Sequence, residues 1–292
     1  MKKTMILAAV VAAGMLAGCE KVNLSDINNN KEGNVTLTFV PSTADVQTRA
    51  TVTIGDYFEK LNVMLFDGEG NKAFSQVRTQ TREADDDFGQ LTCQLTEGTY
   101  TVVAVGHSSV KSATIKSPQM VQFTASDGEK LTDTFCYCGT VTVGEQAEQH
   151  SLQMHRVGAM VRFHLTDTDI PATFARRKID YTGGSANFNP TTSEGTTKST
   201  QSENRPRSEA QQYRVYTFPY LAATGTLKMT LTALDADGNT IRQRVFPEVP
   251  VSRNRITTYT GPFFSPGDGQ FSQTGFGFTI DAEWDGEETF TF

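Results

Sequence analysis

Apolar and polar side chains alternate along most of this chain, and a period of two is typical of half-buried β-strands. The alternating runs are rich in threonine, valine, tyrosine and phenylalanine. Their apolar positions are Val35, Leu37 and Phe39; Leu61, Val63 and Leu65; Leu91, Cys93 and Leu95; Tyr100, Val102 and Ala104; Val157, Ala159, Val161, Phe163 and Leu165; Leu227, Met229 and Leu231; and Phe276, Phe278 and Ile280. Segments with a helical period are scarce, so the sequence predicts an all-β fold of packed β-sandwiches.

Two segments of the chain end in the same kind of turn. Residues 61–72 (LNVMLFDGEGNK) and 227–240 (LKMTLTALDADGNT) each run from an alternating strand into glycine and asparagine, which supply the positive φ of a hairpin. This echo, together with a length of 292 residues, predicts two similar domains over 34–150 and 151–292. In the second, the polar stretch 187–212 predicts an exposed, mobile insertion.

The N-terminus predicts a lipoprotein export signal. A basic start precedes an apolar run of 12 residues, and the residues LAGC that end at Cys19 match the bacterial lipobox. The run is shorter than the roughly 20 residues that a membrane-spanning helix needs. We therefore expect residues 1–18 to be removed as the signal peptide, Cys19 to be lipidated, and the asparagine-rich residues 19–33 to form a flexible tether. A plain secreted protein is the alternative.

The net charge and the number of cysteines exclude several classes of protein. A net charge of −7, from 26 basic and 33 acidic residues, excludes a binder of nucleic acids or anionic membrane surfaces. Beyond Cys19 an odd number of cysteines remains, which excludes the disulfide framework of small secreted proteins. Cys136 and Cys138 share one strand face, so we expect them to pack in the fold or to offer one disulfide partner to Cys93.

Candidate catalytic and metal-binding motifs are weak. Residues 235–239 (DADGN) resemble the start of a calcium loop, but Phe246 stands where the loop needs a bidentate glutamate, so a hairpin turn is the prediction. His164 lies opposite the apolar face of its strand and is expected at the surface. A solvated loop is predicted for the acidic cluster of Glu83, Asp85, Asp86 and Asp87. We expect no enzyme, no cofactor and no metal site.

Three segments carry a family resemblance: 98–106 (GTYTVVAVG), 154–166 (MHRVGAMVRFHLT) and 253–264 (RNRITTYTGPFF). In this order, behind a lipobox and a polar tether, they resemble the fimbrillin-type proteins that build type V pili in the Bacteroidetes, particularly the lipid-linked anchor subunits of the FimB-like group. The resemblance implies two tandem transthyretin-like antiparallel β-sandwich domains. It also implies a structural lipoprotein of the outer membrane, exposed at the cell surface, whose partners are other fimbrial subunits. The sequence leaves open which leaflet the lipid occupies.

The resemblance further implies assembly by strand exchange, in which a protease removes an N-terminal strand and a strand of a neighbour fills the groove. Arg49 and Ala50 resemble a processing site of this kind. A chain cut there would lose its lipid and become a polymerising or tip subunit, whereas an intact chain would remain at the membrane as the anchor, which is our prediction. Residues 281–292 are expected to form a final core strand, with a donor strand as the alternative.

A second class of function is a surface lipoprotein that binds a glycan or a host ligand through aromatic side chains. The nearest aromatic cluster is Tyr213, Tyr216, Phe218 and Tyr220. Alternating aromatic residues are more often part of a core than of a sugar platform, because their rings bury large apolar areas. We therefore rank the structural, fimbrial function first.

Overall fold

The computed structural model describes residues 33–42, 53–110, 113–123, 131–209, 212–264, 277–281 and 288–290. The predicted lipidation site Cys19 and the predicted processing site at Arg49 and Ala50 lie outside these residues. Across the described ranges the protein is built from strands and two short 3₁₀ helices, η1 (Ile54–Asp56) and η2 (Arg207–Glu209), which confirms the all-β prediction. No helix in this part of the chain is long and apolar enough to cross a bilayer.

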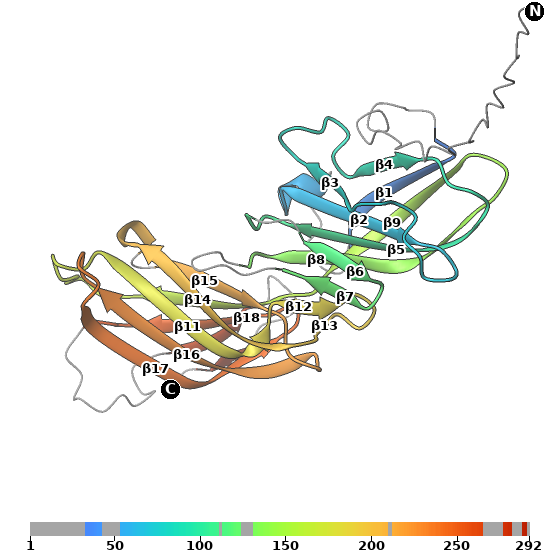
Figure 1. Cartoon of the computed structure of the whole chain (residues 1–292). Helices are drawn as coiled ribbons and strands as arrows, with labels where there is room; N and C mark the ends of the chain where they lie inside the picture. The colour runs from blue at the N-terminus through green and yellow to red at the C-terminus, as the bar shows by residue number, and fades with distance from the viewer. Residues whose placement is uncertain are drawn as a thin grey trace, which may run out of the picture.

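The strands fall into two bodies that lie next to each other in Figure 1. Those of the first half are β1 (Val35–Pro41), β2 (Lys60–Phe66), β3 (Arg78–Thr81), β4 (Gln90–Cys93), β5 (Gly98–His107), β6 (Thr114–Ser117), β7 (Met120–Gln122), β8 (Thr134–Val143) and β9 (Glu148–Arg156). Those of the second half are β10 (Ala159–Leu165), β11 (Arg176–Ser185), β12 (Asn187–Asn189), β13 (Glu194–Gly195), β14 (Lys198–Pro206), β15 (Gln212–Thr217), β16 (Thr224–Leu234), β17 (Thr240–Ser252), β18 (Ile256–Gly261), β19 (Gly277–Asp281) and β20 (Glu288–Phe290).

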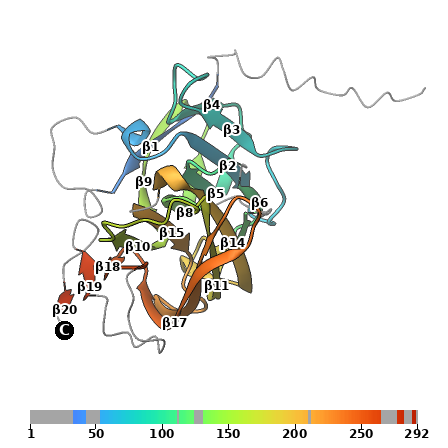
Figure 2. The same ribbon diagram turned by 90° about the vertical axis from the view of Figure 1, so that its left-hand side faces the viewer.

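Each half buries its own hydrophobic core. In the first half the strand order is β3-β2-β5-β8-β9-β1-β4, and β8 meets β9 only at Phe135↔Arg156 and Cys136↔His155. Side chains from both sides of this narrow contact pack into one core, as in a sandwich. The second half has separate sheets, β14-β11-β16-β17 and β15-β10-β18-β19-β20, that enclose a second core. Figure 2, which is turned by 90° from Figure 1, shows that β19 and β20 continue the second of these sheets beyond β18.

The two halves repeat one strand topology. The first strand of each half pairs in parallel with a strand that comes late in the same half, β1 with β9 and β10 with β18. The first strand also pairs antiparallel with an edge strand, β4 or β15. The other sheet repeats as β3-β2-β5-β8 and β14-β11-β16-β17. Two parallel pairs are therefore part of a fold whose other strand pairs are antiparallel, the arrangement that the resemblance implied.

The turn echo in the sequence does not mark equivalent positions. Asn71 N donates to Asp67 Oδ1 at 2.8 Å and Asn239 N donates to Asp235 Oδ1 at 2.7 Å, so the two turns share one geometry. The hairpin turn predicted in place of a calcium loop is confirmed. However, the first turn follows β2 and the second follows β16, whereas the repeated topology matches β2 with β11 and β16 with β5. Local turn chemistry, which needs only a few adjacent residues, accounts for the echo.

A small sheet joins the halves. Its order is β13-β12-β7-β6, and β12 from the second half pairs antiparallel with β7 from the first. Ala186, Phe188 and Phe218 belong to the first core although they lie in the second half of the sequence. The boundary predicted between residues 150 and 151 falls inside β9, and the change from one core to the other comes between Val157 and Ala159.

The prediction of an exposed, mobile insertion at 187–212 is wrong, because this stretch forms β12, β13, β14 and η2. β14 alternates exposed residues with three buried polar ones, Gln201, Glu203 and Arg205. The Tyr181 hydroxyl lies 2.9 Å from both Gln201 Oε1 and Glu203 Oε1, and Arg205 bonds to Glu203. Polar side chains can face a core when they satisfy one another, which an apolar-period search does not detect.

Other residues named from the sequence are placed as follows. His164 is exposed and the apolar face of its strand is buried, as predicted. Cys93, Cys136 and Cys138 are free thiols, so the expected packing is confirmed and the alternative disulfide does not form. Burial raises the pKa of Cys93 to about 11, which keeps that thiol protonated. Among the described residues, no three His, Cys, Asp or Glu side chains are grouped closely enough to hold a metal ion.

Candidate functional site

β1 is the first described strand of the chain and lies within the sandwich of the first core. It is hydrogen-bonded on both sides, in parallel to β9 and antiparallel to β4. Val35 and Leu37 are fully buried and Phe39 is 2% exposed, so every second side chain of β1 fills the core. An inserted strand of this kind contributes both its backbone bonds and its apolar area, at about 25 cal/mol per Å² buried.

The N-terminal end of β1 is fixed by two close contacts. The Asn34 side chain donates to Leu95 O at 2.8 Å and accepts from Leu95 N at 2.9 Å, so one amide completes the backbone pairing beyond β4. A Cβ on Gly33 would lie 2.6 Å from Cys93 O, which leaves room there only for glycine. These contacts set the register of β1, and the register decides that Val35, Leu37 and Phe39 face the core.

β1 lies between the two sites that the sequence predicts. Since β1 spans Val35–Pro41, it lies after Cys19 and before Arg49 in the sequence. The next described element, η1, begins at Ile54, where Asp56 Oδ2 accepts from Thr53 N at 2.9 Å. Cleavage after Arg49 would therefore separate β1, together with any lipid on Cys19, from the rest of the sandwich.

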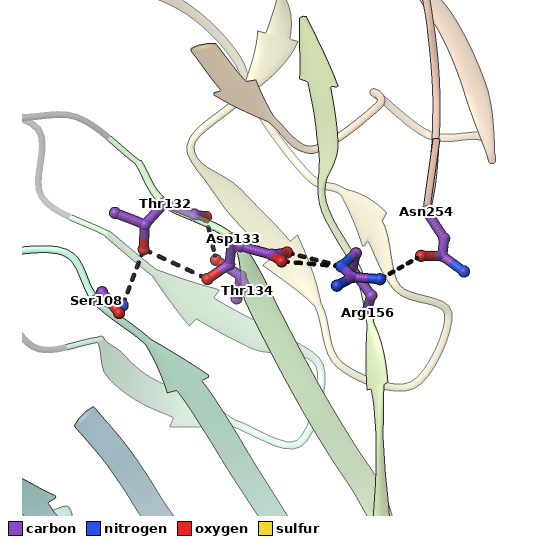
Figure 3. Close-up of polar contacts among 6 residues, drawn as sticks. All are labelled: Ser108, Thr132, Asp133, Thr134, Arg156 and Asn254. Carbon is purple, nitrogen blue, oxygen red and sulfur yellow. Dashed lines mark hydrogen bonds and ion pairs between the residues drawn. The ribbon is translucent and has the colours of Figure 1, made fainter. Parts of the chain in front are cut away.

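A polar cluster links the two halves at the end of β9. Arg156 donates through Nε to both carboxylate oxygens of Asp133, at 2.9 and 3.0 Å, and through Nη1 to Asn254 Oδ1 at 3.1 Å. Figure 3 shows Arg156 between these partners, which come from opposite halves of the chain. The guanidinium carbon also lies 4.6 Å from the Phe135 ring centroid. The side chain of Arg156 is 5% exposed and that of Asp133 is 21% exposed, so the arginine is shielded from solvent and the carboxylate is partly hydrated.

Asn254 brings the second half into this cluster through its backbone conformation. Its φ of 56° lies in the left-handed region, which asparagine tolerates better than most residues. Its N–H donates to Gly158 O at 2.8 Å, in the link that leads from β9 into β10. The turn between β17 and β18 is thereby held against the point where the chain passes from the first core to the second.

A buried histidine holds the loop beside this junction. His107, at the end of β5, has its Nε2 2.9 Å from Asn62 Oδ1, and its Nδ1 accepts from Ser109 N at 3.1 Å. In the same loop, Ser108 N donates to Thr132 Oγ1 at 2.9 Å (Figure 3). Burial, followed by the charge of Lys60, lowers the pKa of His107 to about 3, so the ring is neutral in the folded protein.

We expect His107 to make stability fall in mild acid. The unfolded histidine takes up a proton below its ordinary pKa of 6.5, whereas the folded one does not until about 3, so stability is lost as pH falls through this window. Between pH 7 and pH 5 the loss is about 2 kcal/mol, which urea unfolding at the two pH values will measure. His107→Gln should remove most of this dependence and His164→Gln, at an exposed site, should keep it. Equal pH dependence in both variants would contradict the assignment.

The aromatic cluster proposed for ligand binding is divided between the cores. Tyr213 is 3% exposed and stacks on Phe163 with ring centroids 5.0 Å apart, inside the second core. Phe218 is 1% exposed and packs on Phe188 in the first core. Tyr216 and Tyr220 are half-buried. These four rings therefore do not form one exposed surface.

Comparison with solved structures gives relatives of low sequence identity. A protein from Bacteroides thetaiotaomicron VPI-5482, described as a candidate polysaccharide-binding protein (DUF1812), has a TM-score of 0.53 and 10% identity, covering 89% of this chain and 99% of its own. The fimbrial anchor protein Mfa2 from Porphyromonas gingivalis has a TM-score of 0.43 and 11% identity, covering 84% and 95%. A fimbrial assembly protein from Parabacteroides distasonis ATCC 8503 has a TM-score of 0.46 and 13% identity, covering 88% and 98%. None of these three descriptions names an enzyme.

The first of these similarities shows a shared fold and no more, given its identity. No curated protein matches the chain. Residues 27–292 match the family described as a family of unknown function, DUF6562. Because this match takes in both cores and nearly the whole length of the chain, the protein belongs to the DUF6562 family.

Proposed function

We propose that the protein is a structural, non-enzymatic lipoprotein that anchors a fimbria to the outer membrane and contacts other fimbrial subunits. The observation that carries the proposal is the place of β1, a core strand that lies in the sequence between Cys19 and Arg49. An intact chain joins the lipid to the folded body through this strand. Removing the lipid by cleavage would also remove three buried side chains from the first core.

The retained strand favours the anchor over a processed subunit. With β1 in place, its slot between β9 and β4 is filled, so the first sandwich offers no open groove to a neighbour there. Cleavage after Arg49 would open the slot and expose core residues and two strand edges, which a strand from another subunit could cover. The processed shaft or tip subunit is therefore the alternative within the same class of protein.

The intact mass of the native protein tests this proposal. We expect the membrane fraction to contain a chain that starts at acylated Cys19, and Cys19→Ala to release the protein from the membrane. Arg49→Ala should leave both the N-terminal residue of the chain and the membrane attachment unchanged, because the anchor is not cut. A mass that starts at Ala50, recovered from sheared filaments, would replace the anchor with the polymerising subunit.

Ligand binding is the second candidate function. A protein of the same fold is described as a candidate polysaccharide binder, and the present chain can be tested for the same property on a glycan array. Since Tyr213 and Phe218 lie in separate cores, we expect no binding that depends on the four-ring cluster. Binding that is lost in Tyr220→Ala, at one of the half-buried rings, would revive this candidate.

A further inference from the structure

An arginine occupies a core position in the second sandwich. The burial pattern of β11 alternates so that Arg177, Ile179 and Tyr181 all face inward. Arg177 is 1% exposed and pairs with Arg205 on one side and Ala233 on the other. A buried guanidinium remains charged and carries five N–H donors, so its environment must compensate both the charge and the donors.

Aromatic rings surround the charge of Arg177. Its guanidinium carbon lies 4.3 Å from the centroid of Phe263, 5.2 Å from Phe174, 5.4 Å from Tyr213 and 5.5 Å from Phe264. Ring faces attract a cation, and this accounts for the burial of the charge. They do not replace hydrogen-bond acceptors along the edge of the guanidinium plane.

The hydrogen-bond donors of this site have no acceptor among the described residues. Nε, Nη1 and Nη2 of Arg177 are all buried without a hydrogen-bond partner, and so is the hydroxyl of Tyr213, which is 3% exposed. Burial raises the pKa of Tyr213, so its hydroxyl stays protonated and is also a donor. An unsatisfied buried donor destabilises the folded state, and a charged one does so more strongly.

The nearby acidic groups are committed elsewhere. Asp167 accepts the backbone N–H of Phe263 at 2.7 Å and of Phe264 at 2.6 Å, and it influences Arg177 through its charge without a hydrogen bond to it. Glu203 is bonded to Tyr181 and Arg205. Arg242 and Arg244, which are half-buried, donate to Phe264 O and Phe263 O. Cations thus outnumber carboxylates around Phe263 and Phe264.

We propose that the guanidinium of Arg177 and the hydroxyl of Tyr213 together bind one small anion of about the size of chloride. The guanidinium is positively charged, and its three nitrogens and the Tyr213 hydroxyl are buried N–H and O–H groups without a partner, which selects an anion over a cation. The ligand is small because the residues that bind it are at most 3% exposed. A water molecule would satisfy some of the donors, but it would not balance the positive charge. The site lies in the second core, apart from β1, and does not depend on the anchoring function.

Thermal unfolding of the full chain in sodium chloride and in sodium isethionate at equal ionic strength tests the site. Isethionate is too bulky for a buried site of this kind, so matched ionic strength separates binding from screening. We expect the melting temperature of the second core to rise in chloride only, by roughly 3–5 °C for each tenfold increase above the dissociation constant. Equal melting temperatures in the two salts would overturn the proposal.

Variants locate the effect at Arg177. Arg177→Met should abolish the chloride dependence, and Tyr213→Phe, which keeps the ring stack and removes one donor, should weaken it. Arg78→Met is the matched control, because Arg78 also packs on an aromatic ring, 4.7 Å from the Phe74 centroid, but in the first half. The melting temperature of Arg78→Met should depend on chloride as strongly as that of the wild type.

Crystals of the wild-type chain grown in bromide give a direct reading that does not depend on whether a variant folds. An anomalous peak within hydrogen-bonding distance of Arg177 and Tyr213 is the expected result. The proposal fails if bromide binds elsewhere only, or if Tyr213→Phe and wild type respond equally to chloride.

Discussion

A chain that begins at Ala50 is expected to lose the fold of its first core, because it lacks β1. Val35, Leu37 and Phe39 each contribute about 1.5–3 kcal/mol by burial, and together they approach the whole stability of a typical domain. The strand pairs of β1 with β9 and β4 disappear as well. Calorimetry of this truncated chain should show only the transition of the second core.

Supplying the missing strand should reverse this loss. A synthetic peptide of residues 33–42 is expected to restore the first transition, since it carries the alternating side chains and the Asn34 contact to Leu95. A peptide with Leu37→Asp is the matched control, because it places a charge at a fully buried position and should not bind. If the truncated chain melts like the full chain, β1 is not the strand that completes the sandwich.

Arg156→Met is expected to weaken the connection between the two halves by about 3–5 kcal/mol, because it leaves the Asp133 carboxylate beside an apolar side chain. It also removes the bond to Asn254, which crosses 98 residues of sequence. If the two cores unfold together in the wild type, we expect two separate calorimetric transitions in the variant. The melting temperature of the second core should change little.

A second arginine serves as the control for this result. Arg162→Met removes a half-buried guanidinium that donates to Thr258 Oγ1 at 3.1 Å within the second sheet, away from the junction. It should lower stability by a smaller amount without separating the transitions. Identical calorimetric profiles for Arg156→Met and wild type would show that the coupling of the halves does not depend on Arg156.

The first strands of the two halves, β1 and β10, differ in their position relative to Arg49. β1 and β10 occupy equivalent places, yet only β1 lies upstream of Arg49, and β10 follows β9 directly in the sequence. Cleavage at Arg49 would therefore open one sandwich and leave the other complete. A processed subunit would therefore need a strand from outside only in its first sandwich, in the half that carries the N-terminus.

Local patterns predicted the class of the fold correctly. Alternation identified β1, β2, β5, β10 and β16 because side chains on a pleated strand point to opposite faces whatever the strand pairs with. The turn at 235–239 was predictable for the same reason, as the Asp235 carboxylate bonds to Asn239 only four residues away. The predicted sites at Cys19, Arg49 and Ala50 also rest on short motifs, and they remain predictions.

The sequence by itself determined the strands with an alternating apolar pattern, the turns and the scarcity of a helical period, since these depend on neighbours within a few residues. Only the tertiary structure decided which strands pair, that Arg156 meets Asn254, and that Arg177 and Glu203 point inward. Those outcomes depend on partners up to about a hundred residues away, and a charged side chain is buried only where the fold brings it a ring, a counter-charge or an acceptor. The apolar pattern of a segment indicates that it is a strand, but it does not indicate which strand it pairs with.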